Sequence, residues 1–478
     1  MNIKKILVSG HFNILHTGHL RLFKFAKELG GLLIVAIEGD LIAGKDAHMP
    51  EKLRLESVDS IGYVDECFIF NNDISSVIKK VRPDIVIKGK EFEGKFNPET
   101  EALAKYGGKL IFSSGEVLLS SLEIIQKEYE IIKKKNFELP INYIERHKID
   151  IYKIPSLIRR FGKLNICVIG DLIVDEYITC DALGMSQEDP TIVVTPVDSK
   201  KFIGGAAIVA AHAASLGANV HFITVAGNDD ERDFVSNNIK KLNINLELLV
   251  DESRPTTLKK RYRCKGKTLL RVSHLHQGEI SKEKQKVIIN LVEKLSKNLD
   301  LMVFSDFNYG CLPQTLVRLI VKKLKNKGIL MAADSQSSSQ IGDLCRFKEM
   351  DLVTPTEREA RISIKNNNDG LVILAEKFRK KSLAKNVLLK MGEEGVLIQV
   401  DRNKDSNWTT DKLPALNNLP KDVSGAGDSM LIVAALTLAV GGNIWESALL
   451  GSIAAAVQVS RLGNTPLKTE ELIREFNI

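Results

Sequence analysis

Asp422-Val423-Ser424-Gly425-Ala426-Gly427-Asp428 is the stretch that most narrows the possible folds of this sequence. An apolar segment follows, from Met430 to Val440. The pattern predicts a tight glycine turn that leads into the N-terminus of a buried helix. The unpaired N–H groups of a helix N-terminus attract anions, such as a transferring phosphoryl group. Asp428 would lie where a carboxylate can take a proton from an attacking hydroxyl. The plainer alternative is a glycine loop before a core helix, with Asp428 as a first-turn acid.

Composition limits the class of protein. The chain has 478 residues, of which 44% are hydrophobic and 27% charged, as in soluble globular proteins of two or three domains. The net charge is only +7 and the aromatic content 6%. Nucleic-acid binding requires a concentrated basic face with stacking aromatics, so we expect no nucleic-acid partner.

We expect a cytoplasmic protein without a membrane partner. No run reaches the ~18 apolar residues that span a bilayer. The N-terminus leads directly into a strand-like run, Ile6-Leu7-Val8, and lacks the pattern of a signal peptide. The six cysteines are scattered without a C-x-x-C pair, which favours reduced thiols over disulfides or a zinc site.

The first part of the chain predicts an α/β domain. A strand at 6–8, a glycine turn at 9–12, a helix that includes Leu20, Phe23 and Ala26, and a strand at 32–37 form a βαβ unit. Further strands are expected at 67–70, 85–88 and 109–112. Ligands bind at the carboxyl ends of such parallel strands.

Two histidines, His16 and His19, are three residues apart, so one helical turn presents both on one face. Two imidazoles beside helix N–H groups can hold nucleotide phosphates and stabilise a pentavalent phosphorus as pyrophosphate leaves. Alternatively, the two histidines could be zinc ligands, although no third ligand lies nearby at motif spacing. Alternatively, the two histidines only cap a helix and have no role in nucleotide binding.

The stretch from His16 to His19 resembles the HxGH motif of the cytidylyltransferase-like nucleotidyltransferases, and the resemblance covers residues 5 to about 127. Three later segments also match: 50–54, 88–92 and 120–125. Asn13 stands where the family usually has Asp. The resemblance implies catalysis by His16 and His19 on ATP or CTP. The implied nucleotide-binding residues are Gly10, Phe12, His16, His19, Lys24, Arg54, Lys88, Ser120 and Ser121.

We place the domain boundary near residue 140. Residues 121–136 are predicted to form one helix, and a polar stretch then leads to an amphipathic helix at 151–161. The predicted division is a first domain at 1–138, a linker with a leading helix at 139–160, and a second domain at 161–478.

The second domain alternates strands and helices. Strands are expected at 164–169, 192–194, 201–203, 221–225, 301–305, 329–333, 352–354 and 387–390, with a small-residue helix at 206–216. This alternation predicts a parallel doubly wound sheet. The segments 261–263 and 269–272 are expected to form a small β lid beside it.

This half resembles the ribokinase-like (PfkB) sugar kinases along its whole length, at 170–175, 204–207, 305–307, 390–395, 422–428 and 461–463. The resemblance implies that Gly425, Ala426 and Gly427 form an anion hole and that Asp428 is the catalytic base. The implied nucleotide-binding residues are Lys390, where the T-x-G-x-x-G motif has Thr, with Gly392, Gly395, Thr356 and Glu359. ATP and Mg²⁺ are implied, with Glu359 as a metal ligand. The expected sugar-binding residues are Asp175, Gly204, Gly205, Arg261, Arg263, Arg271 and Asp306, and the three arginines could grip a sugar-borne phosphate.

The two halves together resemble the bifunctional ADP-heptose synthase type, with the order of the domains reversed. The sequence departs from that type at Ile208 (for Asn), Ser273 (for Asp), Thr356 (for Asn) and 334–336 (for D-P-K). The resemblance implies a sugar-phosphate kinase joined to a nucleotidyltransferase, in a homodimer paired through the β lid. Two alternatives remain: another sugar or polyol activated with CTP, or one half kept as a regulatory nucleotide-binding module.

Overall fold

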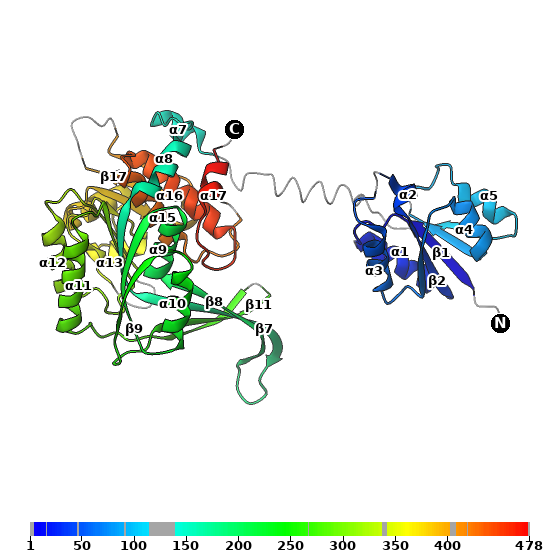
Figure 1. The fold of residues 1–478 in the computed structure, drawn as a ribbon, viewed down its shortest axis with the longest axis horizontal. Helices are drawn as coiled ribbons and strands as arrows, with labels where there is room; N and C mark the ends of the chain where they lie inside the picture. Colours follow the sequence, from blue (N-terminus) through cyan, green and yellow to red (C-terminus); the bar gives the residue numbers. More distant parts are fainter. Residues whose placement is uncertain are drawn as a thin grey trace. The chain divides into compact units, whose positions relative to one another are not determined.

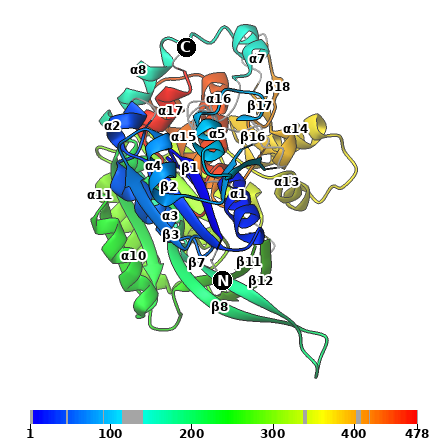
Figure 2. The ribbon, with the colours of Figure 1, turned by 90° about the vertical axis from the view of Figure 1, so that its right-hand side faces the viewer.

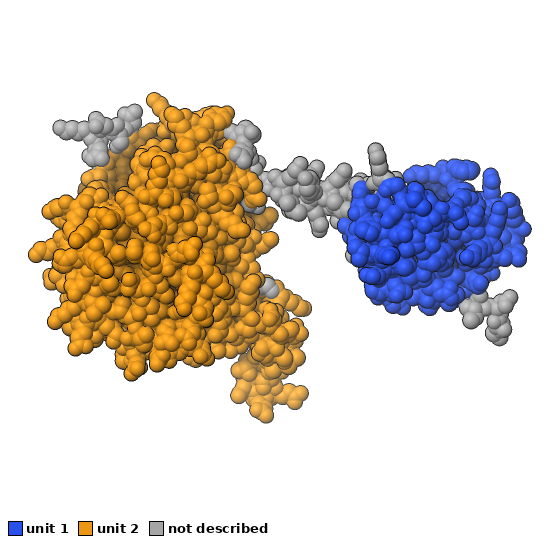
Figure 3. Space-filling model, viewed as in Figure 1, with its two compact units in different colours: residues 1–134 blue, residues 135–478 orange. Residues whose placement is uncertain are grey.

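The computed structural model describes residues 4–15, 17–44, 47–89, 92–113, 139–265, 267–336, 342–401, 408–417 and 419–476. The chain divides into two compact units, Met1–Lys134 and Lys135–Ile478, which Figure 3 shows in separate colours. The helix expected at 121–136 lies outside the described residues.

Unit 1 is built on a five-stranded parallel sheet in the order β3-β2-β1-β4-β5. Alternate residues of β1 face opposite sides of this sheet. Ile6 and Val8 pack with α1 and α3, whereas Leu7 packs with α4 and α5. The strands are β1 (Lys5–Gly10), β2 (Leu32–Glu38), β3 (Glu66–Phe70), β4 (Ile85–Lys88) and β5 (Lys109–Phe112); the helices are α1 (Thr17–Glu28), α2 (Asp40–Ala43), α3 (Glu51–Asp59), α4 (Ile74–Val81) and α5 (Pro98–Ala104).

Unit 2 contains a nine-stranded sheet in the order β10-β9-β6-β13-β14-β15-β16-β17-β18. The strands from β10 to β16 run parallel, and β17 and β18 are antiparallel at one edge. Their bounds are β6 (Asn165–Gly170), β9 (Asn219–Ala226), β10 (Asn245–Val250), β13 (Leu301–Asp306), β14 (Leu330–Ser335), β15 (Leu352–Val353), β16 (Asn386–Lys390), β17 (Val396–Val400) and β18 (Thr410–Leu413).

Helices cover both faces of this sheet. One hydrophobic core joins β6 to α9, α15 and α16, and the other joins it to α11, α12 and α14. The helices are α7 (Ile141–Arg146), α8 (Ile154–Arg159), α9 (Ala206–Ser215), α10 (Asp230–Lys240), α11 (Lys282–Leu295), α12 (Gln314–Leu324), α13 (Glu357–Ile364), α14 (Leu371–Ser382), α15 (Ala426–Ala439), α16 (Ile444–Val459) and α17 (Thr469–Arg474), with short 3₁₀ turns η3 (Arg160–Lys163), η4 (Leu344–Arg346) and η5 (Gly392–Glu394).

A separate four-stranded sheet, in the order β12-β11-β7-β8, forms the predicted lid. Its strands are β7 (Leu172–Met185), β8 (Ile192–Gly205), β11 (Thr257–Cys264) and β12 (Lys267–His274). The prediction of two short strands at 192–194 and 201–203 was wrong. Both are parts of the single strand β8, because the residues between them continue the pairing with β7. The β7–β8 hairpin projects from unit 2 in both ribbon views (Figures 1 and 2).

Candidate active sites

The glycine turn leads into a buried helix, as the sequence predicts. Gly425 has φ +78° and precedes α15, whose residues from Asp428 to Thr437 are buried. The first helical hydrogen bond that closes over this turn joins the Ser429 amide to the Gly425 carbonyl, at 3.0 Å. The amides of Gly427 and Asp428 therefore belong to the first turn, where helical N–H groups lack intrahelical acceptors.

Side chains from distant segments hold this turn in place. A Cβ at Gly425 would lie 2.3 Å from the Asn464 side-chain oxygen, so glycine is required both by space and by its positive φ. The Asp422 carboxylate accepts hydrogen bonds from the Gly463 amide at 3.0 Å and the Tyr177 hydroxyl at 2.8 Å. The turn is thus tied to the C-terminal segment and to the lid.

Asp428 is a buried acid with a perturbed pKa. The residue is only 5% exposed. Burial and the nearby carboxylates of Asp334 and Asp175 raise its pKa to about 7, although the ammonium groups of Lys390 and Lys259 oppose the rise. A carboxyl with a pKa near neutrality is well matched to general-base catalysis.

Lys390 lies beside this acid at the end of β16. Its Nζ is 2.7 Å from the Asp334 carboxylate. Burial alone would lower the pKa of Lys390, but Asp334, Glu359 and Asp428 together raise it, so the ammonium stays charged. Burial also raises the pKa of Asp334 to about 6. Glu359 and Thr356 form a reciprocal cap at the start of α13.

A cavity of about 330 Å³ opens at the first turn of α15. Four of the predicted nucleotide-binding residues line it, and Ala426 and Gly427 form part of its wall. Its remaining lining is largely apolar. The lining includes Thr356, Lys390, Gly392, Gly395, Leu416 and Met430.

Two of the predicted sugar-binding residues, Arg261 and Gly204, lie beside Asp175 on β7. Its carboxylate pairs with the Arg261 guanidinium at 2.7 Å. A Cβ at Gly204 would lie 2.4 Å from the same carboxylate, and Gly205, with φ +60°, precedes α9. Ile208, one of the departures from the ADP-heptose synthase type, is buried in the core behind this site.

The other two lid arginines lie close by. Arg261 also donates a hydrogen bond to the Tyr177 hydroxyl at 3.1 Å. The Arg263 guanidinium lies 5.2 Å from the centre of the Tyr177 ring. Arg271 on β12 is directly opposite Arg261 in the strand register. Paired residues of antiparallel strands share a face, so these cations belong to one side of the lid.

Lys259 lies on the same side of the lid, but it was not among the sugar-binding residues predicted from the sequence. Its Nζ lies 5.2 Å from the ring centres of both Phe307 and Tyr309. It faces Asp175 in the strand register and Ser273 on the other neighbouring strand. The signal was present, because Lys259 precedes Arg261 and Arg263 with the two-residue spacing that puts strand residues on one face.

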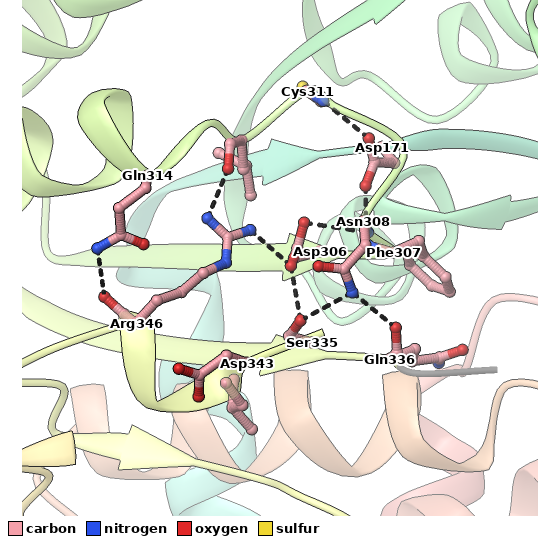
Figure 4. Close-up of polar contacts among 12 residues, drawn as sticks. Asp171, Asp306, Phe307, Asn308, Cys311, Gln314, Ser335, Gln336, Asp343 and Arg346 are labelled. Atoms are coloured by element: carbon pink, nitrogen blue, oxygen red, sulfur yellow. Dashed lines mark hydrogen bonds and ion pairs between the residues drawn. The ribbon is translucent and has the colours of Figure 1, made fainter. Parts of the chain in front are cut away.

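Asp306 has contacts that anchor loops (Figure 4). Its carboxylate pairs with Arg346 at 2.7 Å and accepts hydrogen bonds from the Ser335 hydroxyl at 2.6 Å and the Asn308 amide at 3.2 Å. Its predicted contact with a sugar stays a prediction.

Asp171 fixes the loop that follows β13. Its carboxylate accepts hydrogen bonds from the amides of Phe307 at 2.7 Å and Cys311 at 3.1 Å (Figure 4). It also accepts one from the Tyr309 amide at 3.3 Å. Burial and the neighbouring Asp306 raise the pKa of Asp171 to about 6. This bonding sets the positions of the two aromatic rings beside Lys259.

In unit 1, His16, Ser120 and Ser121 lie outside the described residues. His19 is on α1, and its ring contacts Phe12 edge to face with 5.2 Å between ring centres. Phe12 is buried with φ +50°, and a Cβ at Gly10 would lie 3.3 Å from its ring. The structure thus brings Gly10, Phe12 and His19 together at the carboxyl end of β1.

The predicted cations of unit 1 have protein partners. Arg54 is fully buried and donates to the carbonyls of Met49, His11 and Glu38 at 2.7 to 2.8 Å. It also pairs with Asp40 at 2.6 Å. Through these bonds, the Arg54 side chain connects the loops that follow β1 and β2.

Lys88 and Lys24 differ in exposure. Lys88 pairs with the buried Glu99 at 2.7 Å, whereas Lys24 is exposed and lies 4.0 Å from Glu28. Asn13 is buried and accepts a hydrogen bond from the His48 amide at 2.9 Å. The predicted nucleotide contacts of Arg54, Lys88 and Lys24 stay predictions.

Three general features concern the described part of the chain. No helix there is long and apolar enough to cross a membrane. Its residues include no group of three His, Cys, Asp or Glu side chains arranged to hold a metal ion. All six cysteines are free. Glu359 as a Mg²⁺ ligand stays a prediction.

Solved structures share the fold of unit 2. Phosphofructokinase-2 from Escherichia coli, in complex with substrates and products, matches 66% of this chain and 98% of its own, with a TM-score of 0.53 and 16% identity. Ribokinase from Thermotoga maritima matches 65% of this chain and 98% of its own, with a TM-score of 0.51 and 23% identity. The expected ribokinase-like α/β fold is confirmed.

Curated relatives carry the name bifunctional protein HldE. The protein from Campylobacter jejuni subsp. doylei is 30% identical over 318 residues, 66% of this chain and 65% of its own. That from Desulfatibacillum aliphaticivorans is 28% identical over 317 residues, 65% of this chain and 63% of its own. The match thus spans slightly less than two thirds of the length of these relatives.

Two family descriptions match separate parts of the chain. Residues 7–107 match the cytidylyltransferase-like family, which confirms the expected class of unit 1. Residues 163–470, more than half of the chain, match the pfkB family of carbohydrate kinases. On this match and the shared fold, the chain belongs to the pfkB carbohydrate kinase family.

Proposed function

We propose that this chain is a bifunctional cytoplasmic enzyme of nucleotide-activated sugar synthesis. Unit 2 phosphorylates a sugar phosphate with ATP, and unit 1 transfers a nucleotidyl group to a sugar 1-phosphate. The observation that carries the proposal is the position of Asp428, a buried acid in the first turn of α15 beside a 330 Å³ cavity. The family membership of unit 2 and the HldE relatives support it.

In the kinase step, the acceptor hydroxyl attacks the γ-phosphorus of ATP. The bond from the acceptor oxygen to phosphorus forms, the bond to the β-phosphate oxygen breaks, and ADP leaves. Asp428 takes the proton of the hydroxyl, and its pKa of about 7 allows it to do so near neutral pH. The amides at 425–427 stabilise the negative charge that develops on the phosphoryl oxygens.

The nucleotide lies in the cavity at α15. Apolar side chains such as Leu416 and Met430 suit a base, and Gly392, Gly395 and Thr356 suit the sugar and phosphates. Mg²⁺ neutralises phosphate charge when bound, and it is usually held by phosphates, waters and one or two carboxylates. Glu359, near the Lys390 ammonium, is the carboxylate that would serve.

The acceptor is a sugar that carries a phosphate, such as a heptose 7-phosphate phosphorylated at O1. Asp175 would bind sugar hydroxyls. Arg261, Arg263 and Arg271 share one side of the lid and supply the charge for a phosphate group. Because Ile208 replaces a polar residue of the ADP-heptose synthase type, another sugar phosphate or polyol remains the alternative acceptor.

In unit 1, His16 and His19 would bind the triphosphate and stabilise the pentavalent phosphorus while a sugar 1-phosphate displaces pyrophosphate. The nucleotide is ATP, or CTP in the alternative. A phosphatase from another chain must act between the two steps if the kinase product carries two phosphates.

The enzyme is a homodimer in this proposal, paired through the lid. The projecting β7–β8 hairpin exposes several large apolar side chains, which supports a covered surface there. They are Leu183, Met185, Ile192 and Val197.

The test uses the full chain with ATP or CTP, Mg²⁺ and a panel of sugar phosphates and sugar 1-phosphates. Asp428→Asn should abolish phosphorylation and preserve pyrophosphate release, whereas His16→Ala should do the reverse. Retention of most kinase activity by Asp428→Asn would show that the base is wrongly assigned. Nucleotide binding without turnover by either half would favour the regulatory alternative for that half.

A further inference from the structure

The ammonium group of Lys390 converges with the main-chain amides of the first turn of α15. A Cβ placed on Gly427 would lie 3.1 Å from Lys390 Nζ. The Lys390 ammonium therefore lies directly beside the first turn of α15, in the wall of the cavity that both residues line. Among the described residues that line the cavity, Lys390 supplies the only positive charge.

The fold holds this ammonium in a fixed position. Lys390 ends β16, and its amide donates to the Pro355 carbonyl at 2.7 Å. The Nζ is 2.7 Å from Asp334 at the end of β14. The Lys390 and Asp334 side chains are 13% and 3% exposed, so the pair is largely shielded from water. A buried ion pair of this kind keeps its geometry better than an exposed one.

Several negative charges already surround the Lys390 ammonium, and a bound anion would add to them. Three carboxylates, those of Asp334, Glu359 and Asp428, act on Lys390. A phosphoryl group that enters the site brings more negative charge toward the same region. Main-chain amides supply only partial charges, whereas an ammonium supplies a full one.

We propose that Lys390 is a further catalytic residue of the kinase step, whose ammonium binds a non-bridging oxygen of the transferring phosphoryl group. This inference rests on the kinase function proposed above. A threonine at this place, as in the T-x-G-x-x-G motif, offers a hydroxyl and no charge. Asp334 orients the ammonium before the phosphoryl group arrives. The interaction strengthens as charge spreads over the phosphoryl oxygens in the transition state.

The test compares wild-type full chain with Lys390→Met, which keeps an unbranched side chain one atom shorter and removes its charge. Each is titrated with ADP, and with ADP plus aluminium fluoride as a mimic of the phosphoryl group, both with Mg²⁺. We expect the affinity for ADP alone to change less than about threefold, the tightening by aluminium fluoride to be lost, and kcat to fall about 100-fold or more.

A second variant controls for folding. Lys390→Met leaves Asp334 buried without its partner, so the double variant Asp334→Asn/Lys390→Met is measured in parallel. The double variant should melt closer to the wild type and still fail to bind aluminium fluoride with ADP. Recovery of that binding in the double variant, or equal loss of affinity for both ligands in Lys390→Met, would overturn the inference.

The outcomes separate this inference from the proposed function. A wild-type chain that binds ADP more tightly with aluminium fluoride, in a way that depends on Lys390, but phosphorylates no sugar phosphate would refute the proposed acceptor and keep the inference. Wild-type turnover with unchanged kcat in Lys390→Met would refute the inference alone. A wild-type chain that binds no nucleotide would refute both.

Discussion

Replacement of Asp428 by asparagine should remove kinase activity and at the same time stabilise unit 2. Burial, reinforced by Asp334 and Asp175, raises the pKa of Asp428 from 3.8 to about 7. The difference corresponds to at most about 4 kcal/mol against the ionised form in the folded protein. Asparagine has nearly the shape of the protonated acid and avoids this cost above neutral pH.

The pH dependence follows from the sign of this shift. Because the pKa of Asp428 is higher in the folded protein, its contribution to stability is fully present below about pH 4 and is lost as the pH rises through about 7. The free energy of unfolding of Asp428→Asn should therefore exceed that of the wild type increasingly from pH 5 to pH 8. Asp171 titrates in both proteins and cancels in the difference, whereas the titration of Asp334 is coupled to that of Asp428 and contributes to it.

Two assays check this prediction. Calorimetry of the full chain should show the melting transition of unit 2 about 5 °C higher in the variant at pH 8 and only about 2 °C higher at pH 5. The wild-type kinase kcat/KM should fall to about a tenth of its plateau at pH 6, since the base must be ionised. A variant that is less stable than the wild type at pH 8, or that keeps more than a tenth of its kcat, would refute the reasoning.

Two further substitutions test other parts of the structure. Arg54→Met should destabilise unit 1 by about 3 kcal/mol, because it removes the four hydrogen bonds of a buried side chain. The melting transition of unit 1 should fall, while Lys24→Met, at an exposed position, leaves it unchanged. An unchanged melting transition in Arg54→Met would contradict the conclusion that Arg54 stabilises unit 1 by connecting these two loops. Lys259→Met should move the half-maximal pH of kinase kcat/KM upward, since its ammonium helps to lower the pKa of Asp428. Lys260→Met, whose side chain pairs with Glu176, is the matched control, and equal shifts in both would show that the effect is not specific.

The sequence predicted the parts of the fold that local patterns determine. The parallel strands of both units, with the exception of β10, were identified because buried parallel strands are continuous apolar runs. The edge strands β10 and β18 were missed, since Asn245 and Glu247 in β10 and Thr410 and Asp411 in β18 interrupt such a run. The inner strand β17 was also missed, although its residues are mostly apolar. The full length of β7 and β8 was missed because their outer halves are exposed and are held by pairing with each other.

The candidate site was predictable where a motif determines the backbone, and not where partners come from distant segments. Gly425 and Asp428 were placed at the start of a buried helix by the glycine turn alone. The pairing of Lys390 with Asp334 joins residues 56 positions apart in the chain, which no local pattern encodes. The enclosure of Arg54 by three carbonyl groups likewise depends on how two loops meet.

The most direct test of the central claim follows phosphorus in a single reaction. Wild-type full chain is incubated with ATP, Mg²⁺ and each sugar phosphate of the panel, and the products are observed by ³¹P NMR. The account predicts ADP and a second phosphate resonance on one sugar, absent with Asp428→Asn. Hydrolysis of ATP to free phosphate with every sugar, or the same new sugar resonance with Asp428→Asn as with the wild type, would contradict it.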